Sequence, residues 1–137
     1  MRVSEGMSSV VLTVGPDHTL REAARQMAKR GVGAAVVIDP EQPGPGIFTE
    51  RDMLTALGRG LDPDQERVCE HLSENLTFAA PDWSLERAAE EMVRGGFRHL
   101  VVIDGGETAG VLSMRDIVRC WTEHGATASV ESARSRG

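Results

Sequence analysis

Apolar residues follow a helical spacing in two places along the chain. Positions i, i+3, i+4 and i+7 are apolar at Leu20, Ala23, Ala24 and Met27, and again at Leu85, Ala88, Ala89 and Met92. This spacing lines up apolar side chains on one face of a helix. Thr19 and Ser84 precede the two stretches as suitable N-caps, and Glu22 has the capping-box spacing from Thr19. Gly31 and Gly96 suit the left-handed residue that ends such helices.

Continuous apolar runs follow both helices and predict buried strands. The runs are AAVVID at 34–39 and HLVVID at 99–104, and such uninterrupted runs are typical of strands covered on both faces. The remaining elements are predicted as strands at 10–14, 46–49, 76–79 and 110–113 and as helices that begin at Glu50 and Met114. The order β-α-β-β-α therefore occurs twice. It predicts an α/β (α+β) fold in which small mixed sheets are flanked by helices.

The chain is an internal duplication. With a shift of 65 positions, and of 64 after one loop, the matching segments are Val3–Ser8 with Val68–Ser73, Gly15–Asp39 with Ala80–Asp104, and Gly46–Met53 with Gly110–Ile117. Two copies are too few for a solenoid, so we expect them to pack against each other with pseudo-twofold symmetry. The predicted boundaries are repeat 1 at 3–58, a linker at 59–67, repeat 2 at 68–122 and a disordered tail at 123–137.

Composition and charge exclude several classes of protein. The 15 basic and 21 acidic side chains give a net charge of −6, and the absence of a basic run argues against nucleic-acid binding. No apolar stretch approaches the roughly 20 residues that span a bilayer, and the first residues lack the apolar core of a signal peptide. We therefore expect a cytoplasmic protein without a membrane partner. Lys29 is the one lysine among the 15 cations, a bias typical of a high-GC bacterial genome.

No residues have the spacing of a catalytic or metal site. Cys69 and Cys120 form neither a C-x-x-C pair nor a disulfide framework. The four histidines are scattered without metal-ligand spacing. The sequence has no local signature of a Ser or Cys nucleophile and no Walker-type loop. We therefore predict a protein that is not an enzyme, holds no metal and requires no cofactor.

A hydroxyl and a carboxylate recur where a strand leads into a helix. Thr49 and Asp52 stand three residues apart at the first such place, and Ser113 and Asp116 at the second. A hydroxyl there can donate to a phosphate oxygen beside helix N-terminal amides. An ionised carboxylate can accept both hydroxyls of a ribose. The alternative is structural, because Thr49 and Ser113 are also good N-caps and an acid in the first turn stabilises a helix.

The two motifs in their context carry a family resemblance. GIFTERD at 46–52 and GVLSMRD at 110–116, each in a β-α-β-β-α unit with a V-V-I-D strand, resemble a CBS domain, the cystathionine-β-synthase-type regulatory module. The chain is similar to a tandem CBS pair over about residues 3–122. The resemblance implies a disk-like pair that binds adenosyl ligands in clefts between the repeats. Val36 and Val101 stand where many CBS domains have a proline.

The resemblance also implies that the two clefts differ. In similar pairs, the phosphate-binding side chains come from the opposite repeat, just before the V-V-I-D strand, where repeat 2 has Arg98 and His99 but repeat 1 has Gly33 and Ala34. The main cleft is expected to use Ile47, Thr49, Asp52, Leu76, Thr77, Arg98 and His99. The weaker cleft, without a phosphate clamp, is expected to use Val11, Leu12, Val111, Ser113 and Asp116. It is either empty or holds an uncharged adenosyl group. Alternatively, Arg98 forms an ion pair and His99 is a packing residue.

The function that follows from the resemblance is sensing of adenine nucleotides. We expect AMP, ADP, ATP or S-adenosylmethionine as a regulatory ligand and a separate effector protein as the regulated partner. We also expect a homodimer formed through the helical faces, because the Leu/Ala/Met stripes are too apolar to remain exposed. The alternative is a dimeric CBS-fold scaffold that binds no physiological nucleotide.

Overall fold

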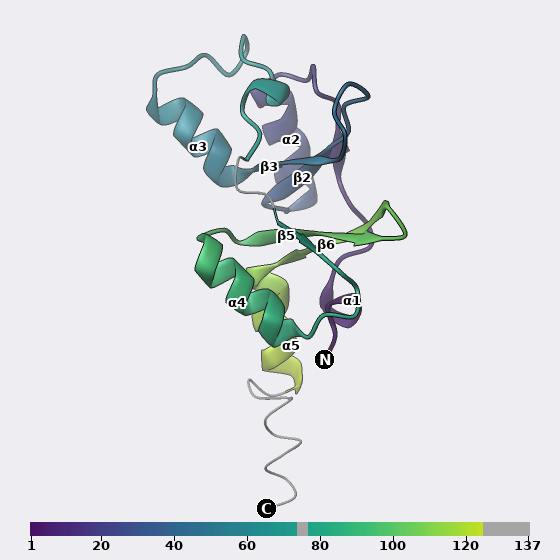
Figure 1. The fold of residues 1–137 in the computed structure, drawn as a ribbon. Coiled ribbons are helices and arrows are strands. Elements are labelled where there is room, and N and C mark those ends of the chain that lie inside the picture. Colours follow the sequence, from purple (N-terminus) through teal and green to yellow (C-terminus); the bar gives the residue numbers. More distant parts are fainter. Residues whose placement is uncertain (74–76, 125–137) are drawn as a thin grey trace, which may run out of the picture. The chain divides into compact units, whose positions relative to one another are not determined.

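The computed structural model describes residues 1–73 and 77–124, and the β-α-β-β-α order occurs twice in them (Figure 1). The elements of the first half are α1 (Val3–Gly6), β1 (Thr13–Val14), α2 (Leu20–Arg30), β2 (Ala34–Val37), β3 (Gly46–Thr49) and α3 (Glu50–Gly58). Those of the second half are the 3₁₀ helix η1 (Val68–Glu70), β4 (Phe78–Ala79), α4 (Leu85–Gly95), β5 (His99–Asp104), β6 (Glu107–Ser113) and α5 (Met114–His124). The predicted fold class is confirmed.

Each half contributes one three-stranded mixed sheet. The strand orders are β1-β2-β3 and β4-β5-β6. In both sheets the central strand is parallel to the first strand and antiparallel to the third. All four residues of β2 are buried, as expected for a central strand with apolar residues on both faces. In the second sheet, α4 and α5 lie on the same face (Figure 1).

The predicted helix ends are confirmed. The Thr19 side chain accepts a hydrogen bond from the Glu22 amide, and the Glu22 carboxylate accepts one from the Thr19 amide, which completes the capping box. Gly31 and Gly96 end their helices with φ of 67° and 72°, a left-handed conformation that costs glycine little. In the part of the chain that the structure describes, no helix is long and apolar enough to cross a membrane.

Some predicted boundaries shift. The strand predicted at 10–14 is reduced to Thr13–Val14, and β6 begins at Glu107 instead of Gly110. The second shift has a local cause. Gly105 and Gly106 both have positive φ, which permits a tight two-residue hairpin turn and lets the antiparallel ladder continue to its end. The predicted tail begins too early, because its first two residues, Glu123 and His124, are the last two of α5. Residues 125–137 lie outside the described residues.

The predicted linker at 59–67 is attached to the first turn of α2. The Leu20 and Arg21 amides donate to the carbonyls of Glu66 and Pro63, so backbone groups of the linker satisfy two donors that a helix start leaves unpaired. The Arg21 guanidinium also binds the Asp64 carboxylate. This contact raises the pKa of Arg21 and lowers the pKa of Asp64.

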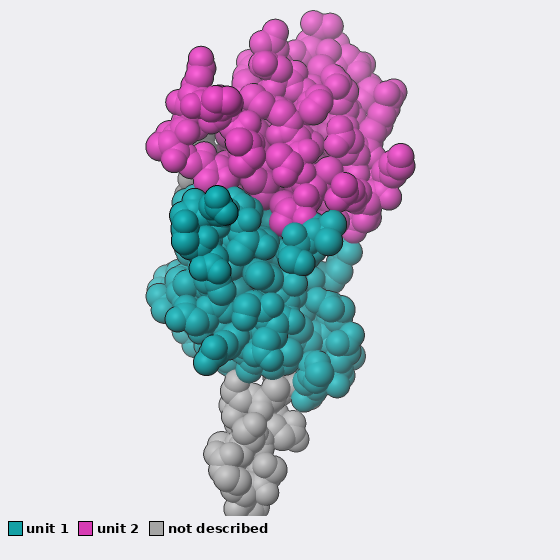
Figure 2. All heavy atoms as spheres, turned by 90° about the vertical axis from the view of Figure 1, so that its right-hand side faces the viewer, with its two compact units in different colours: residues 1–10, 77–137 teal, residues 11–76 magenta. Residues whose placement is uncertain are grey.

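The compact units differ from the sequence repeats. Unit 1 contains residues 1–10 and 77–137, and unit 2 contains residues 11–76 (Figure 2). Each unit has its own apolar core. The first ten residues thus belong with the second half of the chain, and residues 68–73 belong with the first half.

The N-terminal segment is held in unit 1 by backbone hydrogen bonds and by one buried side chain. The Val3 amide donates to the Trp83 carbonyl at 2.8 Å, and Ser8 and Val111 exchange two bonds of 2.9 and 3.0 Å. The Val3 side chain is fully buried in the core that contains Leu85. Helix α1 and its docking were not predicted from the sequence.

Residues 68–73 make the same contacts in unit 2. The Val68 amide donates to the His18 carbonyl at 2.9 Å, and the Ser73 amide donates to the Ile47 carbonyl at 2.9 Å. The Val68 side chain is fully buried. Because Val3–Ser8 and Val68–Ser73 are the matching segments of the duplication, each repeat gives its leading segment to the unit that contains the rest of the other repeat.

The prediction that the Leu/Ala/Met stripes form a dimer interface was wrong. The Leu/Ala/Met stripes are buried in the core of their own unit, as shown by Leu20 at 0% and Met92 at 1% exposure. The exposed apolar side chains of the helices are a different set. They are Leu54 and Leu57 on α3, Val93 on α4 and Val118 on α5.

The docking of the N-terminal segment predicts an effect on stability. Val3→Ala removes two buried methyl groups and should lower the free energy of unfolding by about 2 kcal/mol. Val10→Ala is the matched control, because Val10 is 76% exposed, and it should change stability little. Urea denaturation monitored by circular dichroism measures both variants. Equal unfolding midpoints for the two would show that Val3 is not part of the core.

Candidate functional site

The first strand-to-helix junction is formed by Thr49 at the end of β3 and Asp52 in the first turn of α3. The Thr49 hydroxyl oxygen accepts a hydrogen bond from the Asp52 amide at 3.3 Å. The Asp52 carboxylate accepts one from the Thr49 amide at 2.8 Å. These reciprocal bonds form a capping box. The structural alternative from the sequence is therefore realised at this junction, which we call the first junction.

Three donors converge on one oxygen of Asp52. Its Oδ2 accepts hydrogen bonds from the Thr49 amide, from the Thr49 hydroxyl at 2.9 Å and from the Ser73 hydroxyl at 2.6 Å. Its Oδ1 accepts no hydrogen bond from any residue in the described ranges 1–73 and 77–124. The carboxylate is half-buried. The first junction therefore has one carboxylate oxygen that can accept hydrogen bonds from a ligand.

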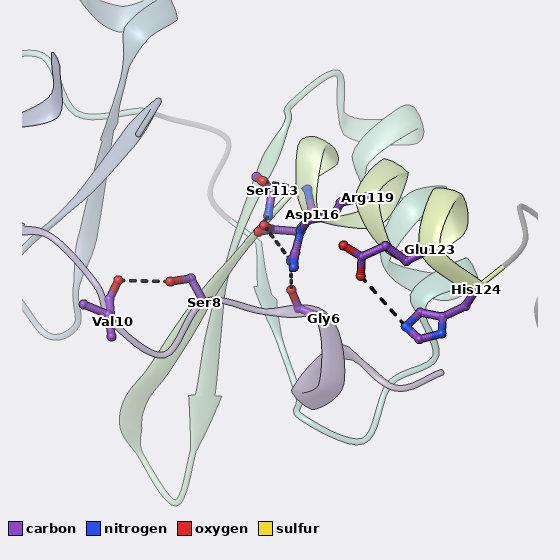
Figure 3. A network of polar contacts seen from close by, with 8 residues as sticks. All are labelled: Gly6, Ser8, Val10, Ser113, Asp116, Arg119, Glu123 and His124. Atoms are coloured by element: carbon purple, nitrogen blue, oxygen red, sulfur yellow. Dashed lines mark hydrogen bonds and ion pairs between the residues drawn. The ribbon is translucent and has the colours of Figure 1, made fainter. Parts of the chain in front are cut away.

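The second junction, Ser113 and Asp116, has the same local hydrogen bonds but different surroundings. The Ser113 amide donates to Asp116 Oδ2 at 2.8 Å, and the Asp116 amide donates to Ser113 Oγ at 3.0 Å. The Arg119 guanidinium donates to Asp116 Oδ1 at 3.3 Å (Figure 3). Both carboxylate oxygens are thus engaged by groups of unit 1.

The hydrogen bond of the Thr49 hydroxyl competes with its predicted role as a donor to a phosphate oxygen. Its hydroxyl hydrogen is directed to Asp52 Oδ2, so a bond from this hydroxyl to a phosphate oxygen would require that contact to break. The ribose role of Asp52 is compatible with the capping box, because the box uses Oδ2 and leaves Oδ1 available.

Within unit 1, the pairing of β5 with β6 places Arg98 and His99 beside the second junction. His99 is opposite Ser113 in the β5–β6 ladder, and the Arg98 carbonyl accepts a bond from the Met114 amide at 2.8 Å. The Arg98 side chain is exposed and forms no hydrogen bond or ion pair within the described part of the chain. That Arg98 and His99 share a site with Thr49 and Asp52 stays a prediction.

The position in unit 2 that matches Arg98 is Gly33, which is uncharged and lies beside the Glu50 carboxylate. The Gly33 carbonyl accepts a bond from the Glu50 amide at 2.9 Å. A Cβ at position 33 would lie 3.1 Å from a Glu50 carboxylate oxygen. The place that carries a cation in unit 1 therefore has a neighbouring anion in unit 2. That the cleft near Gly33 and Ala34 lacks a phosphate clamp stays a prediction.

The other predicted site residues have different degrees of exposure. Ile47 and Leu12 are buried at 3% and 7% exposure, and Leu12 is part of the unit 2 core. Val11, Thr77 and Val111 are partly exposed. Leu76 lies outside the described residues.

Two polar side chains at the junctions were missed from the sequence. Ser73 reaches Asp52 across 21 positions, and its only sequence signal is the match with Ser8 in the duplication. Arg119 follows Asp116 by three positions, a helical spacing that brings side chains together. Cys120, the next residue, is buried in the unit 1 core, and this burial raises the pKa of its thiol.

Comparisons with known proteins identify the repeats. The family model of the CBS domain matches residues 3–59 and 68–123. The CBS domain-containing protein CBSCBSPB3 of Arabidopsis thaliana is 35% identical over 130 residues, which are 94% of this chain and 22% of that protein. The chain thus spans less than a quarter of this curated relative.

Solved structures have the same fold. The hexameric CBS-CP12 protein from bloom-forming cyanobacteria matches with a TM-score of 0.82 and 26% identity over 90% of this chain and 74% of that chain. The CBS domain protein PAE2072 from Pyrobaculum aerophilum, complexed with AMP, matches with a TM-score of 0.78 and 33% identity over 93% of this chain and 100% of that chain. Because the family model matches most of the sequence in two successive ranges, the chain belongs to the CBS-domain family and contains two CBS domains in tandem.

Proposed function

We propose that this tandem CBS pair binds an adenine nucleotide through the first junction and regulates a separate partner protein. The observation that carries the proposal is the available Oδ1 of Asp52. This oxygen belongs to a half-buried carboxylate whose other oxygen is held by three donors. The carboxylate is therefore fixed in orientation before a ligand arrives, which lowers the entropic cost of binding.

The chemistry of a ribose suits this oxygen. A ribose offers two neighbouring hydroxyl donors, and a carboxylate oxygen has two lone pairs. Hydrogen bonds to an ionised acceptor are shorter and stronger than neutral ones. The Ser73 hydroxyl and the Thr49 amide are neutral donors, so they orient the Asp52 carboxylate without neutralising it.

Two further observations support a nucleotide as the ligand. PAE2072, a solved relative whose full length is covered by the match, is complexed with AMP. The Arg98 guanidinium is exposed and forms no bond within the described residues, and guanidinium groups suit phosphates because their planar donors match the phosphate oxygens. We therefore favour AMP, ADP or ATP over S-adenosylmethionine, which has no phosphate.

The regulatory part of the proposal rests on the family, because the CBS domain is a regulatory module. The residues of the first junction would bind a ligand through hydrogen bonds. A bound nucleotide would change the stability and contacts of the pair, and a partner protein would respond to that change.

The proposal predicts different effects for the two aspartates. Asp52→Ala should weaken AMP binding by about ten- to a hundredfold, since a hydrogen bond to a charged group contributes about 1.5–3 kcal/mol. Asp116→Ala should have little effect on AMP binding, because Arg119 already engages Oδ1 of Asp116. Arg98→Ala should weaken the binding of AMP and leave that of adenosine nearly unchanged. Isothermal titration calorimetry with AMP and adenosine measures all three variants.

Other outcomes of this titration would contradict the proposal. Equal losses for Asp52→Ala and Asp116→Ala would show that the two junctions are equivalent. A wild-type protein that binds none of AMP, ADP, ATP and S-adenosylmethionine at millimolar concentration would favour the alternative function, a scaffold without a physiological nucleotide.

We also propose that the chain forms a homodimer through its helices. Leu54 on α3 and Val93 on α4 are exposed to 71% and 76%, and a contact between two copies of the chain would cover these apolar side chains. Light scattering should give twice the chain mass of 14.8 kDa, and Val93→Glu should shift the population toward the monomer because it places a charge in an apolar contact. A mass of 14.8 kDa for the wild type at micromolar concentration would contradict the proposal.

A further inference from the structure

Arg119 connects the second junction to the N-terminal segment. Its guanidinium donates to Asp116 Oδ1 at 3.3 Å and to the Gly6 carbonyl at 3.2 Å. Figure 3 shows the side chain extending from α5 between these two acceptors. It therefore occupies the carboxylate oxygen that corresponds to the available oxygen of Asp52.

The acceptor on the N-terminal segment is held in place. Gly6 is buried, and a Cβ at this position would lie 3.1 Å from Cys120 Sγ and 3.3 Å from a Leu85 methyl group. The next residues continue into the backbone pairing of Ser8 with Val111. The Gly6 carbonyl is thus a fixed second anchor for the guanidinium, and this anchor keeps Arg119 at Asp116.

At the first junction, no cation among residues 1–73 and 77–124 pairs with the Asp52 carboxylate. With the shift of 64 positions that relates the two motifs, Arg119 corresponds to Thr55. Threonine is short and uncharged, so it cannot pair with a carboxylate as arginine does. The second polar contact of the first junction comes from Ser73, and it falls on Oδ2 and not on Oδ1. The difference between Arg119 and Thr55 therefore decides whether Oδ1 of the junction carboxylate is engaged or available.

We propose that Arg119 acts as an internal occupant of the second junction and excludes ribose from it, so that each chain binds one adenosyl ligand and not two. The inference rests on the proposed function, because it assumes that a junction carboxylate is the ribose acceptor. The ribose hydroxyls and the guanidinium are both donors and compete for the same Oδ1. Arg119 is thus a specificity-determining residue that acts by occupying an acceptor.

The test replaces Arg119 by its counterpart in the other repeat. Arg119→Thr frees Asp116 Oδ1. The variant should keep its fold, because the arginine side chain is half exposed, and circular dichroism checks this. Adenosine is the probe because it carries no phosphate. The loss of the Arg119 guanidinium therefore does not weaken its binding through a lost phosphate contact. Isothermal titration calorimetry should give one adenosine per wild-type chain and two per Arg119→Thr chain. The affinity of the new site should be within about tenfold of that of the first, a difference of 1.4 kcal/mol.

A double variant identifies the new site. Arg119→Thr combined with Asp116→Ala should return the stoichiometry to one adenosine per chain, because the freed acceptor is then absent. A stoichiometry that remains at two would place the second adenosine elsewhere and overturn the inference.

The outcomes separate this inference from the proposed function. If the wild type and Arg119→Thr both bind one adenosine with the same affinity, or if the wild type already binds two, the inference is wrong while the proposed function stands. If the wild type binds none and Arg119→Thr binds one, Arg119 does block its junction and the proposal for the first junction is wrong. If neither protein binds adenosine, both are wrong.

Discussion

The exchanged leading segments are the constraint on which the rest of the structure depends. Val3 and Val68 are fully buried in the cores of their units, and each segment is fixed by backbone hydrogen bonds to the strand that precedes a junction. Neither unit is therefore complete without a segment from the other repeat. Each segment also brings a polar group to a junction. These groups are the Ser73 hydroxyl in unit 2 and the Gly6 carbonyl in unit 1.

The chemical difference between the junctions follows from this docking. The local motif is the same in both, with a hydroxyl residue at the strand end and an aspartate three residues later. In unit 2 the docked segment supplies a neutral donor to Asp52. In unit 1 it supplies an acceptor, and a guanidinium bridges this acceptor and Asp116. Duplication gave two similar motifs, and small changes around them made one carboxylate available and the other engaged.

The sequence was informative where local interactions decide the structure. The helix that begins after Thr19 and ends at Gly31 depends on a capping box, an apolar stripe and a left-handed glycine, all within one segment. The motif residues Thr49 and Asp52 could be placed at a helix start for the same reason. Leu12, which the sequence predicts in the weaker cleft, in contrast belongs to the core of its unit.

The missed features depend on contacts between distant segments. The bond from Arg119 to the Gly6 carbonyl spans 113 positions, and no local pattern indicates it. Helix α1 has four residues, too few for a periodic signal, and it is stable only because Val3 is buried in unit 1. The apolar stripes were predicted correctly as stripes, but the sequence could not show that each unit already covers its own stripe.

The central claim is that two junctions with the same motif differ in their capacity to bind a ribose. Nuclear magnetic resonance tests this claim directly, because the Thr49 and Ser113 amides donate to the two aspartate carboxylates and their signals respond to any ligand bound there. On titration with adenosine, the account predicts that the amide signals of Thr49 and Asp52 shift while those of Ser113 and Asp116 stay in place. Shifts of similar size at both junctions would contradict it.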